Sequence, residues 1–148
     1  MALQPLFIRG WKQLSAYYGQ GCIADTLTYD KENKCYYIEN VTFAGEQWGS
    51  CQFFFYKDTL YSVGFGIESD KGNVIDIYNR NIENVRTKYG KIEGKMICDE
   101  PNNKLCSFDD GITILVIDYK IKEGNFSTLI YQSKKLIKQM DEDAYNDI

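Results

Sequence analysis

Two segments of the chain show the same helical pattern and end in the same way. Apolar residues of the first recur at intervals of four, three and four residues: Phe7, Trp11, Leu14 and Tyr18. Adding 71 to each number gives a second stripe with the same spacing: Tyr78, Ile82, Val85 and Tyr89. A glycine follows each stripe, and glycine ends helices because it adopts the left-handed conformation at little cost. We therefore expect two amphipathic helices, and we interpret them as one unit used twice.

Each predicted helix is followed by short segments that favour strands. These segments are rich in Tyr, Phe, Thr and Val, and turn-forming residues separate them. In the first half we expect strands at residues 22–29, 34–43, 51–56 and 59–66. In the second half we expect strands at residues 92–99, 104–108, 112–121 and 126–131. Consecutive strands should pair antiparallel, because a parallel pair requires a long crossover between its strands.

The predicted order is helix, four strands, helix, four strands, helix, which is an α+β fold. Asp70 is placed to cap the second helix, and Ser133 is placed to cap the last one. We expect one domain over residues 1–148, in which an antiparallel sheet has helices packed on one face. Its parts would be pseudo-repeats at residues 7–70 and 78–132 and a C-terminal helix at residues 133–145.

This order of elements resembles that of small bacterial exported domains, in which a helical segment is combined with a four-stranded antiparallel sheet. The tandem β-lactamase-inhibitor-protein type is one such group, and the SmpA/OmlA-like outer-membrane assembly lipoproteins are another. The resemblance covers most of the chain as topology, and it transfers no functional residue. It implies that a sheet surface binds another protein.

The chain contains no histidine. This absence excludes Ser-His-Asp and Cys-His catalysis, HExxH zinc hydrolysis and haem held by histidine. The net charge of −4 and the pI near 4.9 argue against a nucleic-acid partner, because phosphate binding requires a concentrated basic face. No apolar run approaches the ~18 residues of a membrane-spanning helix. We expect no cofactor and no metal.

The five cysteines occur without CxxC spacing, so no zinc ribbon or thioredoxin motif is indicated. Cys98 and Cys106 flank the turn-forming residues Pro-Asn-Asn, and we expect them to form a disulfide across a hairpin. The pairing of Cys22, Cys35 and Cys51 stays open. Frequent Cys and Tyr without His favour an oxidising compartment, so we predict a periplasmic or secreted protein. The alternative is a cytoplasmic protein with inert, buried thiols.

Aromatic residues supply the candidate binding site, because partner surfaces use such side chains as anchors. The candidates are Tyr36, Tyr37, Trp48, Tyr56 and Tyr61, together with Glu46. We place Trp48 on a loop, FAGEQWGS, where it would either anchor a partner or fold back onto the core. The alternative is that most of these residues belong to the hydrophobic core or its rim and bind no partner. The segment TILVIDY, residues 113–119, predicts a central strand covered on both sides.

The composition favours a non-catalytic protein-binding module, of inhibitor or immunity type or associated with the cell envelope. Its partner would be another protein, bound across an open sheet face. One alternative is a small hydrolase that uses cysteine or carboxylate chemistry, for which Asp109 with Asp110, or Glu39 with Glu46, are the candidate pairs. The other alternative is a self-associating structural domain, whose homodimer would bury the aromatic patch.

Overall fold

The computed structural model describes residues 28–90, 92–122 and 124–147. The first predicted helix, residues 22–27 of the first predicted strand and Cys22 lie outside the described residues. The two described helices are α3 (Lys71–Lys88) and α4 (Lys134–Asn146). The described strands are β1 (Thr28–Asp30), β2 (Cys35–Phe43), β3 (Glu46–Tyr56), β4 (Thr59–Glu68), β5 (Gly94–Glu100), β6 (Asn103–Asp109), β7 (Thr113–Lys120) and β8 (Phe126–Ser133).

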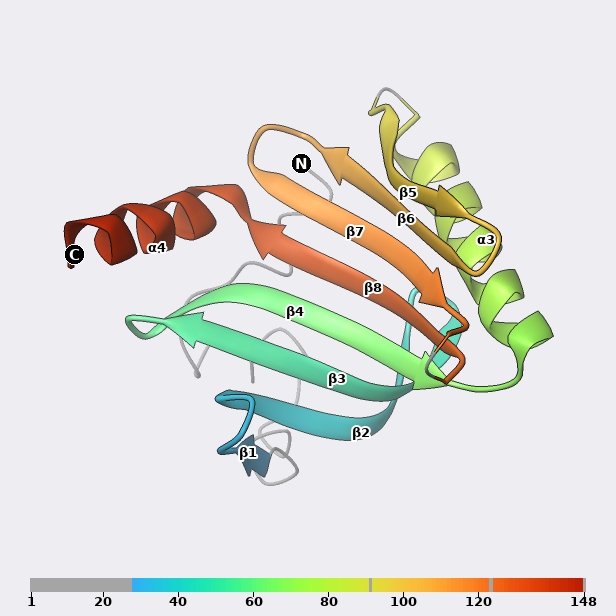
Figure 1. Ribbon diagram of the computed structural model, residues 1–148, viewed down its shortest axis with the longest axis horizontal. Coiled ribbons are helices and arrows are strands. Elements are labelled where there is room, and N and C mark those ends of the chain that lie inside the picture. Colours follow the sequence, from blue (N-terminus) through green and yellow to red (C-terminus); the bar gives the residue numbers. More distant parts are fainter. Residues whose placement is uncertain (1–27, 91, 123, 148) are drawn as a thin grey trace.

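The eight strands form one antiparallel sheet in the order β1-β2-β3-β4-β8-β7-β6-β5 (Figure 1). Consecutive strands are neighbours within each half, and β4 pairs with β8 at the centre. Tight hairpins explain this arrangement. Ala44 with Gly45, and Lys57 with Asp58, all have positive φ, which gives two-residue turns whose twist matches that of the strands. The predicted α+β class and antiparallel pairing are confirmed.

The hydrophobic core lies on one face of the sheet. The register aligns one side chain from each of five strands in a row: Cys51, Phe65, Leu129, Ile117 and Cys106. All five are at most 3% exposed. Because alternate side chains of a strand point to opposite faces, this row identifies the covered face of the sheet. Burial of each of the larger apolar side chains in this row stabilises the fold by about 1.5–3 kcal/mol.

Helix α3 packs on the covered face and contacts β7 and β8. Its buried residues recur at steps of three or four: Val74, Ile77, Tyr78, Asn81, Ile82 and Val85. The backbone N–H of Asn73 donates to the Asp70 carboxylate at 2.8 Å, so the predicted cap is confirmed. The helix ends at Lys88, and Gly90 lacks a positive φ. The predicted left-handed glycine stop is therefore wrong at this position.

Helix α4 continues from β8 and extends away from the end of that strand (Figure 1). The Ser133 hydroxyl accepts a hydrogen bond from the N–H of Leu136 at 3.2 Å, so the second predicted cap is also confirmed. No residue of α4 is buried. Asp143 holds the helix to the β3–β4 turn through a hydrogen bond from Tyr56 and an ion pair with Lys57 at 3.0 Å. Neither of the two described helices is long and apolar enough to cross a membrane.

The 71-residue offset does not extend through the strands. It relates Cys35 to Cys106, and Cys106 projects onto the covered face, as the core row establishes. Cys35 precedes Tyr36, whose cross-strand partner Phe53 lies in the core, so Cys35 projects from the opposite face. The two cysteines are therefore not equivalent positions of one repeat.

Candidate functional site

The sheet face turned away from α3, called the far face below, presents two central rows of cross-strand neighbours. The first row contains Glu39, Ser50, Gly66, Thr128, Asp118 and Leu105. The second row contains Tyr37, Gln52, Gly64, Ile130, Val116 and Ser107. All except Asp118 are at least partly exposed. The buried side of α3 lies on the other face and α4 buries no residue, which makes the far face the candidate site.

Asp118 lies on β7, next to the central β4–β8 pair, and is only 7% exposed. Its carboxylate accepts a hydrogen bond from the Thr128 hydroxyl on the neighbouring strand. Burial raises the pKa of Asp118, because desolvation disfavours the charged form. Within the described chain, no lysine or arginine forms an ion pair with this carboxylate. Lys120, two residues along β7, partly offsets the effect of burial on this pKa. A buried carboxylate without an ion-pair partner is costly, and such groups concentrate at functional sites.

Gly64 and Gly66 leave the middle of β4 without side chains on the far face. Neither has a positive φ. A Cβ at Gly66 would lie 4.0 Å from Ser50 and Thr128, and one at Gly64 would lie 3.6 Å from Ile130. The described surroundings therefore do not require glycine at these positions. Glycine inside a strand weakens the strand, and it often marks a place where another backbone approaches closely.

Trp48 lies in β3 and not on a loop, so the predicted loop is wrong. The tight turn at Ala44 and Gly45 returns the chain early, and β3 begins at Glu46. The Trp48 side chain is 1% exposed, and its ring nitrogen donates to the Phe43 carbonyl at 3.0 Å. Its ring packs against Phe65, with the centroids 5.9 Å apart. Trp48 therefore packs on the core, which was the second of the two predicted roles.

Glu46 is 8% exposed and belongs to an ion pair between the sheet and α3. Arg80 donates to its two carboxylate oxygens at 2.6 and 3.0 Å. This bidentate geometry is the strongest form of the arginine–carboxylate interaction. The same pairing raises the pKa of Arg80, chiefly through the hydrogen bond to Glu46. Glu46 therefore forms a structural ion pair within the chain.

The four candidate tyrosines do not form one patch. Tyr36 lies on the covered face and packs edge-to-face with Phe55, with the centroids 5.9 Å apart. Tyr37 lies on the far face, in the row of Gly64. Tyr56 donates its hydroxyl hydrogen to Asp143 of α4. Tyr61 lies near Phe54, with the centroids 6.1 Å apart, and burial raises its pKa. Of the six predicted residues, Tyr37 is the one in the central rows of the far face.

The predicted disulfide between Cys98 and Cys106 is wrong. The four described cysteines, Cys35, Cys51, Cys98 and Cys106, are free. A β-bulge between Met96 and Cys98 shifts the register, so Cys106 faces Met96 and Cys98 faces Leu105. Equal spacing from the turn therefore does not bring the two thiols together.

Asp118 was missed at the sequence level, although it interrupts the apolar segment TILVIDY. The segment forms β7, between β6 and β8 in the sheet, as predicted. Leu115 and Ile117 are fully buried on the covered face, whereas Ile114 and Val116 on the far face are partly exposed. The predicted cover on both sides is therefore complete only on the side of Leu115 and Ile117. The only sequence signal for the site was a carboxylate within an apolar strand.

One described pocket, of about 370 Å³, lies between α3 and the strands β5 and β6. Its lining includes Tyr78 and Cys106, with Glu83, Arg86 and Asp99 among its charged residues. Burial raises the pKa of Cys106, and it raises the pKa of Tyr78 to about 12. Both groups are therefore protonated near neutral pH, and a protonated thiol is a poor nucleophile. This pocket does not favour cysteine hydrolysis.

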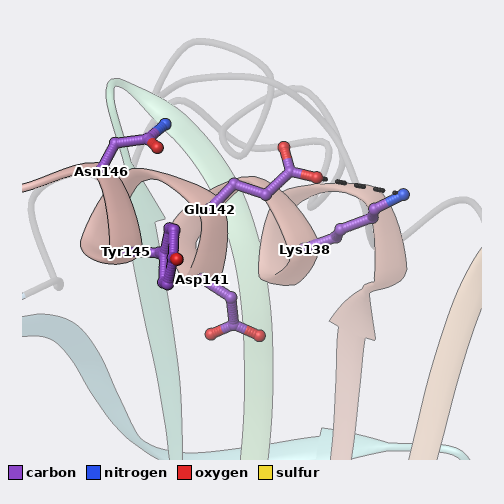
Figure 2. A pocket seen from close by; sticks show the side chains of 5 residues that line it. All are labelled: Lys138, Asp141, Glu142, Tyr145 and Asn146. Carbon is purple, nitrogen blue, oxygen red and sulfur yellow. Dashed lines mark ion pairs between the residues drawn. The ribbon is translucent and has the colours of Figure 1, made fainter.

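A second pocket, of about 500 Å³, lies along α4 (Figure 2). Its described lining residues all belong to this one helix: Lys138, Asp141, Glu142, Tyr145 and Asn146. Lys138 and Glu142 form a loose ion pair at 4.0 Å, and Tyr145 is 78% exposed. The described lining is therefore an exposed helix surface and offers no buried catalytic group. No group of three or more metal-ligating side chains was found among the described residues.

Comparisons with known proteins identified no family model, no curated protein and no solved structure that matches the chain.

Proposed function

We propose that the protein is a non-catalytic protein-binding module and that it binds its partner on the far face. The observation that carries this proposal is the asymmetry of the sheet. One face is buried under α3, with Leu115 and Ile117 fully buried. The other face presents partly exposed apolar side chains, among them Val116 and Ile130, around a buried carboxylate. Contiguous apolar surface rimmed by polar residues is typical of a binding surface.

A different protein fits this surface better than a second copy of the chain. The described part of the far face contains the carboxylates of Glu39, Glu68 and Asp118 and also the ammonium groups of Lys95 and Lys120, and the chain has a net charge of −4. The net negative charge of each chain opposes the association of two copies. A face-to-face homodimer is therefore the weaker alternative.

The hydrolase alternative has less support. Asp109 forms an ion pair with Lys134 at 2.7 Å and accepts the N–H of Gly111, and both contacts lower its pKa. Asp110 accepts the N–H groups of Ile112 and Thr113 in the same turn. Contacts of this kind show that Asp109 and Asp110 stabilise the turn. Glycoside hydrolysis instead requires one carboxyl with a raised pKa on the opposite side of a cleft from the second.

The proposal includes a repeated architecture, in which residues 7–70 and 78–132 are related units. Its support is the strand order, in which β4 and β8 meet at the centre and β1 and β5 occupy the edges. A periplasmic or secreted location also remains a prediction from the frequent Cys and Tyr without His, and the four described cysteines, which are free, lend it no disulfide.

The test is affinity capture from the cells that make the protein, followed by direct binding to the purified partner. Ile130→Arg places a charge in the centre of the far face, and it should abolish capture of a stoichiometric partner. Ile112, a 50% exposed residue in the β6–β7 turn, provides the matched control Ile112→Arg, which should bind normally. Equal capture by both variants, or the absence of any stoichiometric partner, would refute the proposal.

A further inference from the structure

We propose that the pocket between α3 and the strands β5 and β6 binds a free α-amino acid with an apolar side chain. This inference goes beyond the proposed function, because the pocket lies on the covered face whereas the proposed protein partner binds on the far face. Three features of the pocket support it. They are its size and buried apolar lining, a buried hydroxyl without a strong acceptor, and charges of both signs at its rim.

The first feature is the shape of the pocket. Helix α3 contacts β7 and β8, and the pocket lies between this helix and the strands β5 and β6 at the end of the sheet. Its floor, the buried part of the lining, consists of Tyr78, Ile82 and Cys106, which are at most 8% exposed. The volume of about 370 Å³ is near the lower end of the range for small-molecule sites, about 300–1,000 Å³. The pocket therefore suits a molecule as small as one amino acid.

The second feature is the Tyr78 hydroxyl. Tyr78 is 5% exposed, and the described partner of its hydroxyl is the sulfur of Met96 at 4.0 Å, which is a weak acceptor. The neighbouring Tyr119, whose ring centroid lies 5.1 Å away, donates to the Pro101 carbonyl at 2.9 Å instead. Buried tyrosine hydroxyls usually have a good hydrogen-bond partner. An oxygen atom of a bound ligand would give Tyr78 a stronger acceptor than the thioether.

The third feature is the balance of charge at the rim. The described lining contains two cationic and two anionic side chains: Arg86, Lys104, Glu83 and Asp99. Lys104 and Asp99 pair with each other at 3.4 Å, so these two charges compensate each other. Arg86 and Glu83 lie one turn apart on α3, and neither forms an ion pair with a described residue. A ligand with adjacent charges of opposite sign can pair with both, whereas a ligand with one charge would be repelled by one of them.

An amino acid matches this arrangement in each of its parts. Burial raises the pKa of Tyr78 to about 12 and also raises the pKa of Cys106, and the charge of Arg86 opposes both shifts, so the guanidinium lies near both groups. The α-carboxylate would accept hydrogen bonds from Arg86 and Tyr78, and the α-ammonium would pair with Glu83. The apolar side chain would contact Ile82 on the floor.

The experiment titrates the full chain with L-leucine, L-methionine or L-phenylalanine to about 10 mM, which saturates a site of millimolar affinity. Amide chemical shifts are recorded by NMR, and we expect saturable shifts at Ile82, Arg86 and Cys106 with at least one of the three. Two matched probes then test the charges of the amino acid that binds. Its N-acetyl derivative has no ammonium group, and its amide has no carboxylate. Each should bind at least about tenfold more weakly.

Arg86→Gln removes the cation that would hold the carboxylate, so it should raise the dissociation constant at least about tenfold. Lys88→Gln is the matched control and should keep the affinity, because Lys88 also lies in the last turn of α3 but is outside the described lining. Tyr78→Phe removes only the hydroxyl and keeps the buried ring, so it should weaken binding in a folded protein.

Four results would overturn the inference. They are the absence of saturable shifts with all three amino acids, equal binding of either matched probe, unchanged affinity in the Arg86→Gln or Tyr78→Phe variant, and an equal loss of affinity in the Lys88→Gln variant.

Discussion

Arg80 of α3 binds both carboxylate oxygens of Glu46 on β3, at 2.6 and 3.0 Å. This pair connects the helix that packs over β7 and β8 to a strand on the other side of the central β4–β8 pair. Glu46 is 8% exposed, whereas the Arg80 side chain is 51% exposed. Removal of Arg80 therefore leaves a nearly buried carboxylate, whereas removal of Glu46 leaves a guanidinium that is half exposed to solvent.

We predict that Arg80→Ala destabilises the protein more than Glu46→Gln does. Loss of Arg80 leaves a nearly buried carboxylate without its cation, which costs about 1–3 kcal/mol, whereas the amide introduced by Glu46→Gln keeps hydrogen-bonding capacity. Denaturant unfolding of both single variants and the double variant measures the coupling free energy. A coupling near zero would show that the pair contributes little to stability.

Trp48→Ala should lower the free energy of unfolding by about 3–5 kcal/mol, because it removes a fully buried aromatic side chain from the core. Tyr145→Ala, at the 78% exposed position on α4, is the control and should stay within about 0.5 kcal/mol of the wild type. Thermal unfolding of both variants provides the measurement. A stable Trp48→Ala variant that loses partner binding would restore Trp48 as a binding residue.

Docking of α4 should weaken only in strong acid. Hydrogen bonds from Tyr56, Lys57 and Gln139 lower the pKa of Asp143 from its ordinary value of 3.8 to about 2. A lowered carboxylate pKa stabilises the folded state above the ordinary pKa, and this contribution is lost as the pH falls through about 2. NMR titration of the Asp143 carboxyl carbon measures this pKa. Tyr56→Phe should raise it, and titration near 3.8 in the wild type would contradict the docked geometry.

The described cysteines should react as free thiols of different accessibility. Cys98 is partly exposed, whereas Cys35, Cys51 and Cys106 are buried. Alkylation of the native protein should modify Cys98 before these three, and alkylation after unfolding without reductant should modify all four. Intact mass combined with peptide mapping distinguishes the sites. Recovery of a peptide that links Cys98 to Cys106 would contradict the register at the β5–β6 hairpin.

Local sequence patterns predicted the described helices and strands well, because apolar periodicity and turn residues act over a few neighbours. The stripe that contains Tyr78, Ile82 and Val85 is the buried side of α3, and the hairpins follow the expected order. The Cys98–Cys106 disulfide failed because one bulged residue changes the register, and no local pattern reported that bulge.

The site was harder to predict because burial depends on which sheet face receives a helix. Trp48 looked like a loop residue, yet the Ala44–Gly45 turn placed it in a core strand. Asp118 looked like one polar residue in a buried strand, and only the cross-strand register places it in the same row as Gly66. Alternation of side chains gives two faces to every strand but does not say which one is covered.

The most direct test of the binding role compares Ile130→Arg with Ile112→Arg in binding to the purified partner. If the far face is the binding surface, Ile130→Arg raises the dissociation constant at least about tenfold, or about 1.4 kcal/mol, while Ile112→Arg leaves it unchanged. Both variants should keep the thermal midpoint of the wild type within a few degrees. Unchanged affinity in a folded Ile130→Arg variant would contradict the account.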